Sequence, residues 1–170
     1  MDLKQIEIFL LTEQRKMKNA NLILANFDAR LSKIEVKPKS EQTKVTLSTR
    51  MYNEETDEKE NVKIIFDHVA AMEFRINYFD NMIGAEVFGL YEIPDKGFIE
   101  QVVNGNFERR KEVYLLEGGY NYDEEDEHDL LNVLDLAGTF ATEKDSYHAY
   151  VQNVDAGVYI VIAKEVQIVR

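Results

Sequence analysis

The sequence contains no cysteine and no tryptophan, and only two prolines and three histidines among its 170 residues. The lack of cysteine excludes disulfide bonds and thiolate metal sites, which suits a reducing compartment. No apolar run approaches the roughly 20 residues of a membrane-spanning helix. The start of the sequence has neither a basic leader nor a small-residue cleavage site. We therefore expect a cytoplasmic protein with no signal peptide and no membrane association.

Catalytic motifs are missing as well. No glycine-rich phosphate loop occurs, because the pair Gly118-Gly119 is followed by a tyrosine and acids. No Gly-x-Ser-x-Gly nucleophile elbow is present, and Ser146 near His148 is interpreted as a chance neighbour on an alternating strand. We therefore predict no catalytic residue.

Acidic residues are in large excess. Asp and Glu number 32 against 20 Lys and Arg, for a formal net charge of -12. Residues 1–50 carry ten basic and six acidic residues, a net charge of +4, whereas residues 51–170 carry ten basic and 26 acidic residues, a net charge of -16. Such a field repels nucleic acid and accelerates encounter with basic partners. A basic protein partner is favoured over direct nucleic-acid binding, although acidity can also serve solubility alone.

Alternating apolar residues indicate strands over much of the chain. The pattern predicts three strands between Asn61 and Ile93, and it predicts a strand from Thr43 to Tyr52 that pairs with Val62 to Phe66 across an acidic loop. That loop is either a solvated tip or a docking knob. A strand from 22 to 36, with a break near Ser32, should end at Pro38. The stretch Val158 to Ala163 is apolar on both faces, which is typical of a central strand.

Helical spacing is restricted to shorter segments. We predict a helix from Asp2 to Lys18, with a strand as the alternative, and a short helix over 98–103 that Asn104-Gly105-Asn106 terminates. A strand is expected over 112–116, and a further helix over 130–136. Together these patterns predict a single domain, 1–170, of α+β and mainly β class. It would be a curved antiparallel sheet or sandwich of about seven or eight strands with two or three short helices.

Each histidine has a carboxylate close in sequence: Glu124 lies four residues before His128, Asp67 precedes His68, and Asp145 lies three before His148. Such groups can hold zinc or another divalent ion. However, neither His-x-x-x-His nor His-Glu-x-x-His spacing occurs. We expect no metal and no cofactor, and an enzyme that uses carboxylates and histidine remains an alternative.

The most acidic stretch lies beside tyrosines and before a helical pattern. Aromatic anchors are enriched in protein interfaces, and complementary charge steers association. We therefore predict a partner-binding site that comprises Tyr120, Tyr122, Asp123, Glu124, Glu125, Asp126, Glu127 and Asp129. The alternative is that these acids only form a solvated helix start at the favourable end of the helix dipole.

The segments Val62–Val69, Tyr147–Tyr150 and Val158–Ala163 resemble the strands of small acidic β-rich bacterial proteins, among them immunity proteins that neutralise toxins. The resemblance implies a cytoplasmic inhibitor that covers a toxin's active site with acidic residues. Our hypothesis is a non-enzymatic acidic binding protein, an inhibitor or immunity-type protein that binds a basic partner such as a toxin. An accessory or structural subunit of a phage or secretion assembly is a further alternative. The sequence does not fix the oligomeric state.

Overall fold

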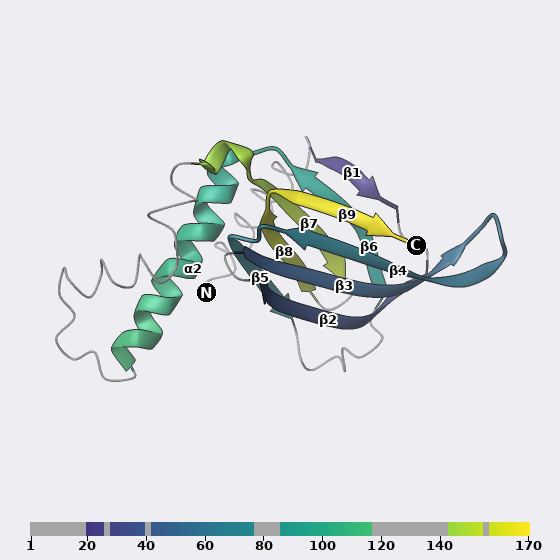
Figure 1. The fold of residues 1–170 in the computed structure, drawn as a ribbon, viewed down its shortest axis with the longest axis horizontal. Helices are drawn as coiled ribbons and strands as arrows, with labels where there is room; N and C mark the ends of the chain where they lie inside the picture. The colour runs from purple at the N-terminus through teal and green to yellow at the C-terminus, as the bar shows by residue number, and fades with distance from the viewer. Residues whose placement is uncertain (1–19, 26–27, 40–41, 77–85, 117–142, 155–156) are drawn as a thin grey trace, which may run out of the picture.

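The computed structural model describes residues 20–25, 28–39, 42–76, 86–116, 143–154 and 157–170 (Figure 1). Nine strands of this described part form one antiparallel sheet, so the predicted mainly β class is confirmed. Within the described ranges the structure contains one α-helix, α2 (Lys96–Leu116), and a 3-10 turn, η4 (Lys144–Ser146). The expected two or three short helices are therefore not confirmed in that part of the chain. None of the described helices is long and apolar enough to cross a membrane.

The strands follow the sequence in the order β1 (Asn21–Leu24), β2 (Ala29–Lys39), β3 (Gln42–Asn53), β4 (Glu58–Asp67), β5 (Ala71–Ile76), β6 (Glu86–Ile93), β7 (His148–Val154), β8 (Gly157–Ala163) and β9 (Glu165–Val169). In the sheet they are arranged β5-β8-β7-β6-β2-β3-β4-β9, and β1 pairs with β6. The predicted pairing of residues 43–52 with residues 62–66 is confirmed, because β3 and β4 form an antiparallel hairpin.

The sheet bends into two layers that face each other (Figure 1). We name β5, β8, β7, β6 and β1 the inner layer, and β2, β3, β4 and β9 the outer layer. The layers are joined where β2 begins, since only Ala29 and Arg30 of β2 pair with β6 before the strand continues along β3. Ala29 is fully buried at this corner.

The space between the layers holds the larger of the two apolar cores. Alternate residues of β3 and β4, such as Leu47 and Phe66, face Tyr150 and Val161 of the inner layer. The intervening residues of β3 and β4 point to the opposite side, as the period of two requires. The pattern that predicted these strands is therefore the pattern that fills this core.

Strand β8 is buried on both faces. Tyr159 and Val161 contact the core between the layers, whereas Ile160 and Ile162 pack with the helix side. On that side, α2 covers the inner layer with Phe98 and Ile99 and the next turn of the helix. The prediction that 158–163 forms a strand without a polar face is confirmed, because a helix and a second layer enclose it.

Helix α2 differs from the prediction. It begins where Asp95 Oδ1 accepts hydrogen bonds from the main-chain N–H groups of Gly97 and Phe98, at 2.9 and 3.3 Å, an N-cap arrangement. It then continues through Asn104-Gly105-Asn106 to residue 116, so the predicted helix end and the predicted strand over 112–116 are wrong. Within this continued helix the side-chain amide of Asn106 donates to the Val102 carbonyl, and its Oδ1 accepts from Arg109.

The region 21–39 also differs in detail. The chain leaves the strand conformation between β1 and β2, rather than near Ser32. At Ser32 the register instead shifts between Leu31 and Lys33, which indicates a β-bulge. Pro38 does not end the strand, because β2 extends to residue 39 and Pro38 lies opposite Thr43 in the hairpin with β3. A bulge or a proline near a hairpin end interrupts regular pairing without ending the strand.

Candidate functional site

The predicted partner-binding residues Tyr120, Tyr122, Asp123, Glu124, Glu125, Asp126, Glu127 and Asp129 lie outside the described residues, together with His128. The helices predicted over 2–18 and 130–136 also lie outside them. Two other arrangements of polar side chains within the described ranges are candidates for function. One is a histidine–carboxylate pair beside the start of α2, and the other is the acidic hairpin between β3 and β4.

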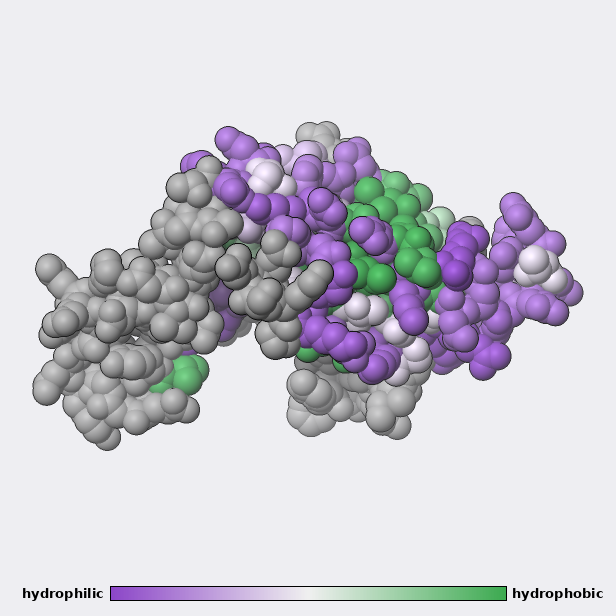
Figure 2. Space-filling model, in the orientation of Figure 1, coloured by the Kyte–Doolittle hydropathy of each residue, from purple (hydrophilic) through white to green (hydrophobic). Residues whose placement is uncertain are grey.

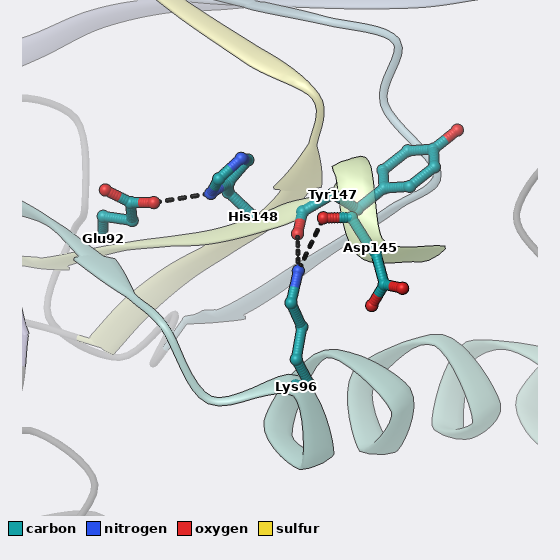
Figure 3. Close-up of polar contacts among 5 residues, drawn as sticks. All are labelled: Glu92, Lys96, Asp145, Tyr147 and His148. Carbon is teal, nitrogen blue, oxygen red and sulfur yellow. Dashed lines mark hydrogen bonds and ion pairs between the residues drawn. The ribbon is translucent and has the colours of Figure 1, made fainter. Parts of the chain in front are cut away.

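His148 and Glu92 form the histidine–carboxylate pair. Nδ1 of His148, on β7, donates to Oε1 of Glu92, on β6, at 2.6 Å. Glu92 lies directly opposite Tyr150, so His148 is its diagonal neighbour across the strand pair, a distance that long side chains bridge. Both side chains reach solvent, with exposed fractions of 42% for His148 and 22% for Glu92. The pair therefore offers an oriented imidazole at the protein surface (Figure 3).

Lys96 holds the neighbouring backbone in place. Its ammonium group donates to the main-chain oxygens of Asp145 and Tyr147, at 2.8 and 3.2 Å (Figure 3). This contact ties the beginning of α2 to the beginning of β7. A pocket of about 110 Å³ lies beside it, lined by Lys96, Ile99, Glu100, Lys144 and Asp145. Typical ligand pockets measure about 300–1,000 Å³, so this pocket is too small for most metabolites.

Ser146 and Tyr150 carry hydroxyl groups and lie two residues from His148 in the sequence. Ser146 Oγ donates to the main-chain oxygen of Glu143 at 2.7 Å, so its hydroxyl is oriented by the 3-10 turn and not by His148. Burial raises the pKa of Tyr150 to about 12, with smaller contributions from the carboxylates of Glu92 and Glu165. Tyr150 therefore stays neutral at physiological pH. An imidazole oriented by a carboxylate can act as a general base, but here no hydroxyl group is held as its nucleophile among the described residues.

Sequence proximity did not identify the partner of His148. The spacing suggested Asp145, whereas the structure places the Asp145 main chain on Lys96 and pairs His148 with Glu92. The only sequence signal for this pair is that both residues lie on strands, and their register across β6 and β7 could not be read from one sequence. Within the described ranges no group of three or more His, Asp or Glu side chains is arranged to hold a metal ion.

The β3–β4 hairpin extends beyond the body of the sheet and is hydrophilic along its length (Figures 1 and 2). Its side chains at 54–59 are exposed, and four of these six residues are acidic: Glu54, Glu55, Asp57 and Glu58. The one basic residue in this stretch, Lys59, is engaged by Asp28 in an ion pair of 2.7 Å. The tip of the hairpin therefore presents negative charge that no neighbouring cation in the described structure neutralises.

The hairpin turn is held by specific hydrogen bonds. The N–H of Asp57 donates to the Asn53 carbonyl at 3.0 Å, and the N–H of Glu55 donates to Asn53 Oδ1 at 2.9 Å. The hydroxyl of Tyr52 donates to the Asp57 carboxylate, and this hydrogen bond is the main reason that the pKa of Tyr52 is raised. Asp57 adopts a φ of 58°, a left-handed conformation that Asp tolerates in turns. The acids are thus carried by an ordered turn.

Comparisons with known proteins found no match: no protein-family model, no curated protein and no solved structure is similar to this chain.

Proposed function

We propose that the protein is a non-enzymatic acidic binding protein of the inhibitor or immunity type, which binds a basic partner protein such as a toxin in the cytoplasm. The observation that carries the proposal is the ordered, protruding β3–β4 hairpin with its exposed acids Glu54, Glu55, Asp57 and Glu58. A rigid acidic projection fits the cleft of a nuclease or another enzyme whose substrate is an anion. The net charge of -12 supports the same assignment, because it steers basic partners toward the protein.

The hairpin supplies charge but no apolar anchor, since residues 53–60 include no hydrophobic side chain. Binding energy in protein interfaces comes largely from buried aromatic side chains and arginines. In our proposal Tyr120 and Tyr122 supply this anchor, and the run from Asp123 to Asp129 adds charge. The hairpin would then determine mainly the association rate, and the tyrosines mainly the dissociation rate.

The decisive experiment compares association rates of charge variants. A basic protein that co-purifies from the native host would be identified by native mass spectrometry, and its binding to the purified chain measured by surface plasmon resonance. The triple variant Glu54→Gln, Glu55→Gln and Glu58→Gln should associate more slowly and with a weaker salt dependence. A matched control, Glu108→Gln, Glu112→Gln and Glu165→Gln, changes the net charge equally at exposed positions outside the hairpin.

If both triple variants lose the same fraction of the association rate, only the overall charge matters and the hairpin is not the docking element. Neutralising Asp123, Glu124, Glu125 and Asp126 should likewise slow association, whereas Tyr122→Ala should mainly accelerate dissociation. A partner that binds all these variants with wild-type rate constants would overturn the proposal. An accessory subunit of a phage or secretion assembly would be indicated instead if the co-purifying protein were a structural component of such an assembly.

A second candidate function is an enzyme that uses a histidine and a carboxylate. It is favoured by the hydrogen bond of 2.6 Å between His148 and Glu92, which leaves Nε2 of an accessible imidazole as the basic nitrogen. Hydrolysis of p-nitrophenyl acetate is a simple test, because an activated imidazole attacks this ester directly. Activity that His148→Ala abolishes and His68→Ala preserves would support the enzyme. Equal background rates in all three proteins would exclude this role for His148.

A further inference from the structure

The exposed face of the outer layer has a charge opposite to that of the whole chain. Residues between the buried positions of β2, β3 and β4 point away from the core. The basic ones among them are Arg30, Lys33, Lys37, Lys44, Arg50, Lys59 and Lys63. The acidic residues on the same face of β2, β4 and β9 are Glu35, Asp67 and Glu165. We name this surface the basic face. Figure 2 shows hydrophilic residues on the side that faces the viewer over β2 and β3, beside a hydrophobic patch toward β9 and β1, where Val169 and Leu22 are exposed.

The basic face places like charges opposite each other. Arg30 lies directly opposite Arg50, and Lys37 directly opposite Lys44. Directly opposed like charges destabilise an antiparallel strand pair. Such pairs are tolerated where carboxylates neutralise the opposed charges, and an anionic ligand could do the same for cations without a carboxylate partner.

Part of this charge is neutralised within the protein. Glu35 makes ion pairs with Lys33 and Lys37, at 3.2 and 3.3 Å. Asp67 pairs with Lys44 at 3.0 Å. Arg50 and Lys63 are exposed and form no ion pair with any described residue. The available positive charge thus lies at Arg50 and Lys63, on the two strands that extend into the acidic hairpin.

We infer that the basic face, centred on Arg50 and Lys63, binds the acidic β3–β4 hairpin of a second copy of this chain. The hairpin continues β3 and β4 beyond the end of this face (Figure 1), and in the described structure its acids form no ion pair with Arg50 or Lys63 of their own chain. The charges are complementary: Glu54, Glu55 and Glu58 against Arg50 and Lys63. The inference rests on the proposed function in that the hairpin is the docking element.

The contact is heterologous, because the hairpin and the basic face are different surfaces. Such contacts produce head-to-tail chains or rings rather than two-fold dimers. Two copies with a net charge of -12 each repel one another at long range. At an ionic strength of about 0.15 M the Debye length is about 8 Å. Salt therefore screens the long-range repulsion between two copies more strongly than it screens ion pairs in direct contact. We therefore expect association at moderate ionic strength that is lost at about 1 M salt, where the Debye length is about 3 Å.

Sedimentation velocity of the full chain over a concentration series tests the inference. The wild type should form species larger than a dimer at high concentration. The face variant Arg50→Gln with Lys63→Gln, and the hairpin variant Glu54→Gln, Glu55→Gln and Glu58→Gln, should each lose self-association. The mixture of the two variants should form 1:1 dimers and nothing larger, because one retains only its hairpin and the other only its basic face. The control Arg109→Gln with Lys144→Gln removes two exposed cations elsewhere and should associate like the wild type.

A wild type that stays monomeric at all concentrations would overturn the inference, and so would a face variant that associates like the wild type. Nucleic acid is the alternative ligand of the basic face, and titration with a fluorescent single-stranded DNA oligonucleotide tests for its binding. Binding by a monomeric wild type and not by the face variant would assign the face to nucleic acid instead. The proposed function has a separate test, which is the association rate of the hairpin variant with a basic partner. That rate can be reduced or unchanged whether or not the chain self-associates.

Discussion

Phe66 of β4 and Tyr150 of β7 pack ring against ring across the two layers of the sheet, with centroids 5.5 Å apart and planes inclined by 48°. Phe66 is fully buried. This contact joins residues that are distant in the sequence, and it lies in the core between the layers. The stability of the two-layer arrangement should therefore depend strongly on the Phe66 side chain.

Phe66→Ala should destabilise the protein by about 3–5 kcal/mol, the range found when a buried phenylalanine leaves a cavity. Phe88→Ala is the matched control, because Phe88 is 42% exposed and its truncation leaves no closed cavity. Urea unfolding followed by circular dichroism measures both variants. Equal losses of unfolding free energy would show that the layers are not held together at Phe66.

Tyr150 should make the protein sensitive to alkaline pH. Its pKa is raised from 10.0 to about 12 in the folded state. As the pH rises, the Tyr150 hydroxyl therefore loses its proton at a lower pH in the unfolded chain than in the folded protein. The stabilisation is complete below pH 10 and is lost as the pH rises toward 12. Tyr150→Phe should therefore reduce the decline of the urea midpoint over this interval, whereas Tyr91→Phe, at a partly exposed position, should retain it. An unchanged pH profile for Tyr150→Phe would show that this hydroxyl is hydrated in the folded protein.

Gln152 is a polar side chain in the core, with an exposed fraction of 1%. Its Nε2 donates to the Phe88 carbonyl at 3.1 Å, and its Oε1 has no hydrogen-bond partner in the described structure. Gln152→Glu should lower the unfolding free energy by about 1–3 kcal/mol or more at neutral pH, because a carboxylate cannot donate to that carbonyl. The buried acid would have a raised pKa, so its destabilisation should shrink as the pH falls.

The control for this substitution is Gln167→Glu on the exposed side of β9. It should change stability by no more than about 0.5 kcal/mol, as surface substitutions usually do. Thermal melts of both variants at neutral and acidic pH separate the two cases. A Gln152→Glu variant whose melting temperature matches that of Gln167→Glu at every pH would mean that water reaches position 152.

Gly105 tests the course of α2. A Cβ added to it would find its nearest neighbour, Arg109 Nη1, at 3.8 Å. Gly105→Ala should therefore stabilise the protein by up to about 1 kcal/mol, the difference in helix propensity. If the helix ended here with glycine in a left-handed conformation, the same substitution would destabilise it. Gly89→Ala is the contrasting control, because its Cβ would lie 3.0 Å from Leu22 Cδ1 and 3.3 Å from the Leu24 carbonyl oxygen.

Much of the β structure could be predicted from alternation alone. Strands β3, β4 and β8 were recognised because a half-buried strand repeats every two residues, and a strand covered on both faces has no polar alternation. The hairpin loop between β3 and β4 was also identified, although its role as a solvated tip or docking element could not be decided. The residues predicted to bind a partner, Tyr120 to Asp129, lie outside the described residues and remain a prediction.

By itself the sequence determined the mainly β class, the pairing of β3 with β4 and the net acidity, because these depend on local periodicity and composition. Tertiary structure decided the length of α2, whose contacts with the inner layer offset the low helix propensity of Gly105. It also paired His148 with Glu92 rather than with Asp145, and gathered dispersed cations such as Arg50 and Lys63 on one face. These relationships depend on strand register, which is set by the packing of residues far apart in the chain and has no counterpart in local spacing.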